Sequence, residues 1–246
     1  DETGTGKLYQ FFGRKCITYD LEQAIQDKRL TEYYYRPAVV ILTPDELERY
    51  EAISREVGKY IHFDRNGKAV LSEKAKQLLI KRARIIAGAV GKIECLKELI
   101  KPYVKEHNIL VYCGATTLLN EDLEDTDFSE DIRQIDYITR ILGEELQMKV
   151  AQFTSAEDMA LRAKLIEEFK TGTDLQGLIA IKCLDEGVNI PSIRTAFILA
   201  STTNPKEYIQ RRGRVLRTAP GKEYAEIYDM IILPRPLDVV KNLMLD

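Results

Sequence analysis

The stretch "LIAIKCLDEGVNIPSIRTAFIL" (residues 178–199) places two short apolar runs on either side of a polar loop. Each run, at residues 178–181 and 195–199, is continuous rather than alternating, as is typical of a strand buried on both faces. Similar runs follow one another along the chain at residues 38–43, 109–113, 148–153 and 224–232. Amphipathic helical patterns lie between most of them, so the sequence predicts an α/β fold whose parallel sheet carries helices on both faces.

Capping residues indicate where the helices begin. Asp20, three residues before Gln23, predicts a helix over residues 21–30, and Pro44 opens a longer one. Ser155 and Asp158 are candidate caps for a helix that ends near residue 169, and Asn204 with Pro205 marks another start. Active residues in parallel sheets generally lie beyond the carboxyl ends of the strands.

Composition excludes several classes of protein. The net charge is −3, which argues against a simple basic protein that coats DNA. No apolar run reaches the roughly 18 residues of a membrane span, and no signal peptide is evident at Asp1. The four cysteines and two histidines are far apart in sequence, which excludes the common zinc spacings and a disulfide scaffold. We therefore expect a cytoplasmic protein without a metal site or a membrane partner.

Four arginines crowd into "QRRGRVLR" (residues 210–217), where a predicted helix meets Gly213. Guanidinium groups stay charged and bind phosphate oxygens through paired N–H donors. An arginine run is also typical of a solvated basic face or a salt-bridge network, and the acidic loop at residues 181–191, taken alone, is a turn. The order of the two features, with a strand and a capped helix between them, favours a functional interpretation.

These segments together resemble the motifs of superfamily 2 nucleic-acid helicases. "LIAIKCLDEGVNIP" resembles motif V, "STTNPKEYIQRRGRVLR" motif VI and "ILVYC" motif IV, while "AQFTSAEDMALRAKLIEEF" is similar to the segment between motifs IV and V. The XPB-type repair helicases and the helicase subunits of restriction and defence systems are the most similar groups. The resemblance implies a C-terminal RecA-like (P-loop NTPase-like) domain over residues 92–246.

The remainder of the chain also fits this family. Residues 1–43 resemble the connection that follows a first helicase domain, and residues 44–91 resemble a thumb-like helical insertion. The basic helix at residues 72–90 could be a strand-separating wedge against duplex DNA, or an amphipathic helix whose lysines and arginines face water.

The resemblance implies roles for individual residues at the nucleotide. Arg214 and Arg217 would reach the β- and γ-phosphates of ATP as arginine fingers, with Gln210 supporting them. Glu186, Gly187 and Asn189 would form the motif V part of the ATP site. Asn189 stands where much of the family has Asp, so it retains hydrogen bonding without the charge.

The resemblance also implies contacts with the phosphates of a nucleic-acid strand. The candidates are Cys113, Gly114, Thr154, Ser155 and Lys182; for each, the alternative is a plain helix cap or a surface position. Arg162, within the helix that follows, is either a surface charge or a packing residue.

We expect the half that binds the nucleotide to lie outside this sequence. "TGTGK" (residues 3–7) resembles a phosphate-binding loop, but Leu8 replaces the hydroxyl residue and no strand precedes it. No DEAD-like acidic box follows a strand. ATP and Mg²⁺ would be held mainly by an N-terminal helicase domain in cis, so this chain alone is expected to be inactive.

The expected function is thus the C-terminal half of an ATP-dependent DNA helicase or translocase acting on single-stranded or duplex DNA, with repair, restriction or defence subunits as possible partners. The alternatives are an RNA helicase and a non-catalytic docking module derived from a helicase.

Overall fold

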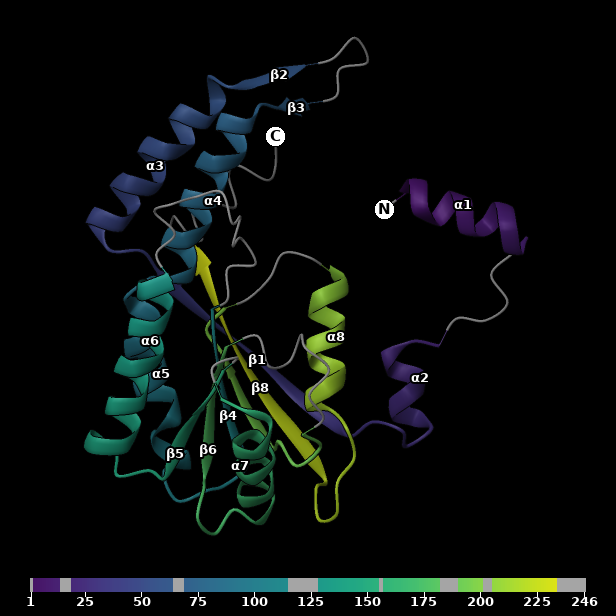
Figure 1. Cartoon of the computed structure of the whole chain (residues 1–246), viewed down its shortest axis with the longest axis vertical. Helices are drawn as coiled ribbons and strands as arrows, with labels where there is room; N and C mark the ends of the chain where they lie inside the picture. The colour runs from purple at the N-terminus through teal and green to yellow at the C-terminus, as the bar shows by residue number, and fades with distance from the viewer. Residues whose placement is uncertain are drawn as a thin grey trace.

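The computed structural model describes residues 2–13, 19–63, 69–114, 128–154, 157–181, 190–200 and 205–233. Within these ranges six strands form one sheet in the order β1-β8-β7-β4-β6-β5, and every neighbouring pair is parallel (Figure 1). The strands are β1 (Glu32–Ile41), β4 (Ile109–Cys113), β5 (Val150–Phe153), β6 (Gly177–Ile181), β7 (Thr195–Ile198) and β8 (Tyr224–Leu233). The predicted parallel α/β sheet is confirmed.

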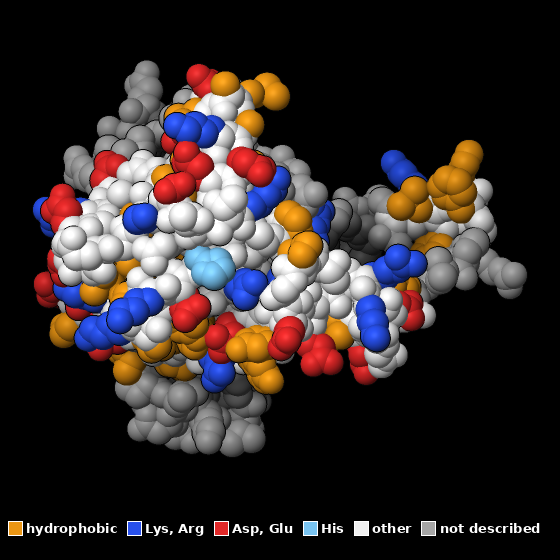
Figure 2. Space-filling model, turned by 90° about the horizontal axis from the view of Figure 1, so that it is seen from below, with side chains coloured by type: hydrophobic (Ala, Val, Ile, Leu, Met, Phe, Trp, Pro, Cys, Tyr) orange, Lys and Arg blue, Asp and Glu red, His pale blue; other side chains and the backbone are white. Residues whose placement is uncertain are grey.

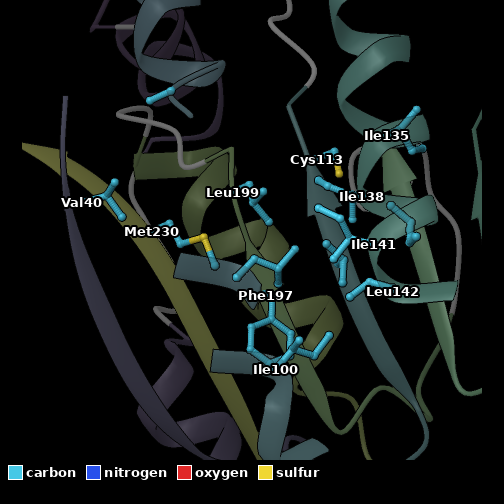
Figure 3. Packing of buried hydrophobic residues seen from close by; sticks show 14 of the residues in the cluster. Val40, Ile100, Cys113, Ile135, Ile138, Ile141, Leu142, Phe197, Leu199 and Met230 are labelled. Atoms are coloured by element: carbon cyan, nitrogen blue, oxygen red, sulfur yellow. The ribbon is translucent and has the colours of Figure 1, made fainter. Parts of the chain in front are cut away.

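Helices cover both faces of this sheet. One face carries α5 (Gly91–Ile100), a 3₁₀ turn (Lys101–Tyr103) and α6 (Phe128–Arg140), which runs on into a π-helical turn (Ile141–Glu145). The other face carries α2 (Leu21–Gln26), α7 (Met159–Thr171) and α8 (Pro205–Val215). Strand β4 explains the continuous apolar runs: Val111 and Cys113 join the core under α5 and α6, whereas Leu110 and Tyr112 join the core under α7 and α8. Figure 3 shows Cys113 within the first of these cores.

A helical hairpin projects beyond the end of the sheet at which the strands finish (Figure 1). It consists of α3 (Pro44–Gly58) and α4 (Glu73–Ala87), joined through the short antiparallel strands β2 (Ile61–Phe63) and β3 (Ala69–Leu71). Thr43 and Glu46 form a capping box at the start of α3. Arg82 of α4 donates to the Ser54 hydroxyl at 3.3 Å, so this arginine packs against α3; the interpretation of the basic helix as a wedge stays a prediction.

The first strand differs from its prediction. We expected a strand buried on both faces at residues 38–43, but β1 begins at Glu32 and is an edge strand whose Val39 and Ile41 are exposed. An edge strand has backbone groups without a sheet partner on one side, so it tolerates Pro37 in its interior. Helix α2 also ends at Gln26, earlier than predicted.

The N-terminal helix α1 (Glu2–Phe12) stands away from the sheet (Figure 1) and exposes Phe11 and Phe12. Residues 3–7, which resemble a phosphate-binding loop in sequence, lie inside this helix. A phosphate-binding loop precedes its helix and does not form part of it. Among the described residues, no helix is long and apolar enough to cross a membrane.

Candidate nucleotide and nucleic-acid sites

Helix α8 and the segment directly after it carry the residues predicted as arginine fingers and the glutamine predicted to support them. Gln210 is exposed near the middle of α8, and Arg214 is half-buried in its last turn. Arg217, also half-buried, lies two residues beyond the last helical residue, Val215. The structure therefore places Arg214 on a regular helix and Arg217 on the segment that follows it.

The backbone of Arg217 is held by the chain that leads into β1. Arg217 forms an isolated antiparallel bridge with Leu30, and the Thr31 N–H donates to the Leu216 carbonyl at 2.7 Å. Because β1 starts at Glu32, Arg217 lies near the end of the sheet at which the strands begin. The general expectation of active residues beyond the carboxyl ends of strands does not apply to this arginine.

Arg211 is an anchor for α8, not a solvated charge. Its side chain is buried, its Nη1 donates to the Ala200 carbonyl at 2.9 Å, and its guanidinium lies 4.7 Å from the centre of the Tyr112 ring. A charged donor on a carbonyl and a cation over an aromatic face are both favourable where water is excluded. Arg211 thereby joins α8 to the ends of β4 and β7.

Arg212 anchors the same helix to the edge of the sheet. Its guanidinium lies 3.9 Å and 3.8 Å from the ring centres of Tyr35 and Tyr208, and Nη1 donates to the Tyr33 hydroxyl at 3.4 Å. Burial and the Asp229 carboxylate, which accepts from the Tyr35 hydroxyl at 2.9 Å, raise the pKa of Tyr35 to about 12. Two of the four clustered arginines thus have structural roles, and Arg214 and Arg217 are the pair predicted to bind phosphate.

Lys92 of α5 holds the end of β7 from the opposite face of the sheet. Its ammonium group is buried and donates to the Leu199 carbonyl at 2.6 Å. Burial lowers the pKa of Lys92 to about 8, although the Asp229 carboxylate partly offsets this effect. The adjacent carbonyls of Leu199 and Ala200, just before the motif VI segment (residues 201–217), are therefore fixed by Lys92 and Arg211 from the two faces. The sequence alone did not identify Lys92.

Two nucleic-acid candidates lie at the end of β4. The Cys113 side chain is fully buried and points into the core beside Ile138 (Figure 3), so only its backbone can meet a ligand. Gly114 is also buried, and a Cβ at this position would lie 3.4 Å from the Ala200 Cβ. These candidates and Arg217 therefore lie at different ends of the sheet.

The Thr154 N–H and hydroxyl both donate to the Glu157 carboxylate, at 2.5 Å and 2.9 Å. Asp158 caps α7 by accepting from the Leu161 N–H at 2.8 Å, so this helix starts later than Ser155 suggested. Arg162 donates to the Thr154 carbonyl and lies over the Phe153 ring, which makes it a packing residue.

The other predicted contacts fall outside the described residues. They are Ser155, Lys182, Glu186, Gly187 and Asn189, and they stay predictions. The described chain resumes at Ile190, which is buried in the core under α7 and α8.

Charge is mixed at the end of the sheet where the strands begin. Seen from that end, basic and acidic side chains alternate over the surface without forming one uniform patch (Figure 2). Among the residues that the structure describes, no group of three or more His, Cys, Asp or Glu side chains could hold a metal ion.

Residues 91–219, more than half of the chain, match the helicase conserved C-terminal domain. The chain belongs to this family, and its sheet has the RecA-like architecture of a C-terminal domain of superfamily 2 helicases.

Individual relatives are distant in sequence. The DNA 3'-5' translocase XPB2 of Sulfurisphaera tokodaii is 21% identical over 231 residues, which cover 88% of this chain and 47% of the relative. The chain thus spans about half the length of that curated protein. The C-terminal part of the Fun30 ATPase domain matches with a TM-score of 0.56 and 16% identity, over 82% of this chain and 86% of the other. The Sulfolobus solfataricus SWI2/SNF2 ATPase core in complex with dsDNA matches with a TM-score of 0.58 and 14% identity, over 87% and 44%.

Proposed function

We propose that this chain is the C-terminal half of an ATP-dependent DNA translocase or helicase. The family, the named DNA translocase among its relatives and the duplex-bound SWI2/SNF2 core of similar fold support this proposal. The observation that carries it is how α8 is held. Arg211 and Arg212 fix the helix to the sheet, and the helix in turn positions Arg214 in its last turn and Arg217 just beyond it.

ATP binds between this domain and an N-terminal helicase domain that holds the nucleotide and Mg²⁺. Arg214 and Arg217 then stabilise the negative charge that develops on the γ-phosphoryl group, and the exposed Gln210 supports them. Arginine fingers in other nucleotide hydrolases increase turnover by about 10³ to 10⁵. Glu186, Gly187 and Asn189 complete the motif V side of the ATP site.

The nucleic acid lies along the other end, where the strands finish and α3 and α4 project. Backbone N–H groups near Gly114 and the side chain of Lys182 contact phosphates there, so binding depends little on base sequence. The Thr154 N–H and hydroxyl already donate to Glu157, and its carbonyl accepts from Arg162. In this proposal Thr154 therefore shapes the turn before α7, and Ser155 is the residue of this turn that meets the strand.

The experiment measures ATP hydrolysis by the full-length protein without nucleic acid and with duplex DNA, single-stranded DNA or RNA at equal nucleotide concentration. The proposal predicts stimulation by DNA. Stimulation by RNA alone would make the protein an RNA helicase. Hydrolysis that is negligible with all three would indicate a docking module.

A further inference from the structure

Lys222, in the turn between α8 and β8, donates to three backbone carbonyls at once. Its Nζ lies 2.5 Å from the Val215 oxygen, 2.9 Å from the Arg217 oxygen and 3.2 Å from the Pro191 oxygen. An ammonium group has three donors and no acceptor, so these three carbonyls use its full capacity. None of the family motifs quoted above includes this lysine.

The three carbonyls belong to two segments that are distant in sequence. Val215 is the last residue of α8 and Arg217 follows it, so their carbonyls lie at the negatively polarised end of the helix, where a cation is favourable. Pro191 ends the motif V segment (residues 178–191). Lys222 therefore joins the end of motif V directly to the end of motif VI.

The position of Arg217 depends on contacts from outside α8 more than the position of Arg214 does. Arg214 lies within α8 and is oriented by the helix, whereas Arg217 lies beyond it. The Arg217 carbonyl accepts from Lys222 at 2.9 Å and from the Thr31 hydroxyl at 3.5 Å. Of these two contacts, the one from Lys222 is shorter and also reaches Pro191.

The surroundings of the turn support a built contact. Arg194, on the segment after Pro191, donates from Nη2 to the Gly221 carbonyl at 2.9 Å, so a second cation joins this segment to the turn that carries Lys222. Gly221 adopts a φ of +69°, which glycine tolerates better than other residues, and this conformation turns the chain into Lys222. Burial and then the nearby Arg194 charge lower the pKa of Lys222 to about 8.

We propose that Lys222 is a positioning residue that sets Arg217 against the end of the motif V segment and so couples the two motifs. The proposal rests on the proposed function, because it assigns Lys222 an effect on ATP turnover through Arg217. Lys222 itself does not contact ATP.

The first test compares ATP turnover by full-length protein carrying Lys222→Met, Lys222→Arg or Lys149→Met, each in the presence of duplex DNA. Lys149→Met is the matched control, because that lysine also donates to a carbonyl, that of Thr173 at 3.1 Å, far from motif VI. Since small misplacements of catalytic groups are costly, Lys222→Met should lower kcat at least about tenfold with little change in KM. Lys222→Arg should restore part of kcat, and Lys149→Met should match the wild type. A kcat for Lys222→Met within twofold of the wild type would overturn the proposal.

A double-variant cycle separates positioning from a general structural effect. If Lys222 acts through Arg217, the Lys222→Met substitution should not lower kcat further in a protein that already carries Arg217→Ala. If Lys222→Met lowers kcat by the same factor in the wild type and in Arg217→Ala, Lys222 acts independently of Arg217, and the proposal is wrong.

Amide hydrogen exchange distinguishes failure of this inference from failure of the proposed function. Lys222→Met should raise exchange in residues 190–194 and 215–218 together, whereas Lys149→Met should raise neither. If the wild type hydrolyses no ATP, the proposed function fails, and exchange still decides whether Lys222 joins the two segments. Unchanged exchange in either segment would refute that connection.

Discussion

Lys92 provides a quantitative test of how the end of β7 is held. The Lys92→Met substitution keeps a side chain of similar length but removes the ammonium group that donates to the Leu199 carbonyl. Burial lowers the pKa of Lys92 from 10.5 to about 8, so keeping the charged form in the folded state at pH 7 costs about 3 kcal/mol. Losing the hydrogen bond and leaving a buried carbonyl without this donor costs about 1–3 kcal/mol. The two effects oppose each other, and the variant should differ from the wild type by no more than about 2 kcal/mol at pH 7.

The pH dependence is more decisive than the value at pH 7. A lysine with a lowered pKa destabilises the fold while both states are protonated, below about pH 8. The penalty disappears as pH rises toward 10.5, because the unfolded state then loses its extra proton. The free energy of unfolding of the wild type should therefore rise by about 2–3 kcal/mol relative to Lys92→Met between pH 7 and pH 10.

Urea unfolding followed by circular dichroism at pH 7, 8, 9 and 10 measures this difference. Subtracting the variant from the wild type at each pH removes the titration of groups common to both proteins. A difference that stays constant within about 0.5 kcal/mol across this range would refute a buried, charged Lys92.

Three further substitutions test the packing around the site by urea unfolding. Phe169→Ala empties a fully buried position of the core under α7 and should cost about 3–5 kcal/mol; a loss below about 1 kcal/mol would contradict this packing. Gly172→Ala places a methyl group 2.7 Å from His107 Cδ2 at a φ of +70°, and should cost about 1–3 kcal/mol from the backbone alone. Adding His107→Ala should recover only the part of the lost stability that comes from the contact, so full recovery of stability would show that the backbone is unstrained. Arg211→Met removes the bond to the Ala200 carbonyl and should cost about 2–3 kcal/mol, and an unchanged midpoint would mean that this arginine is not an anchor.

Much of the sheet could be predicted because its strands are buried on both faces. Runs such as residues 109–113 are continuous and apolar since their side chains alternate between two cores. The start of α8 was also predictable, because Pro205 stands at its first position. Strand β1 was harder to predict, because an edge strand has one exposed side and its tyrosines and Pro37 do not form a continuous apolar run.

The anchoring cations could not be predicted from their local sequence. Lys92, Arg211 and Lys222 are defined by carbonyls that the fold brings to them, at separations of 107, 11 and 31 residues for Leu199, Ala200 and Pro191. A charged residue in a helix or turn is ordinarily solvated, and only the tertiary structure shows that these three are partly or fully withdrawn from water. The candidate site was therefore predicted through its motifs, whereas its supports required the structure.

In the proposed function, Arg217 of this domain acts as an arginine finger on ATP that another domain holds. The most direct test measures single-turnover ATP hydrolysis, and separately ATP binding, for full-length wild type, Arg217→Ala and Arg140→Ala with duplex DNA. Arg140 is the matched control, an exposed arginine over Tyr137 on α6, across the sheet from α8. Hydrolysis by Arg217→Ala should fall by about 10³-fold or more while ATP still binds, and Arg140→Ala should match the wild type. Equal hydrolysis by Arg217→Ala and the wild type would contradict the claim.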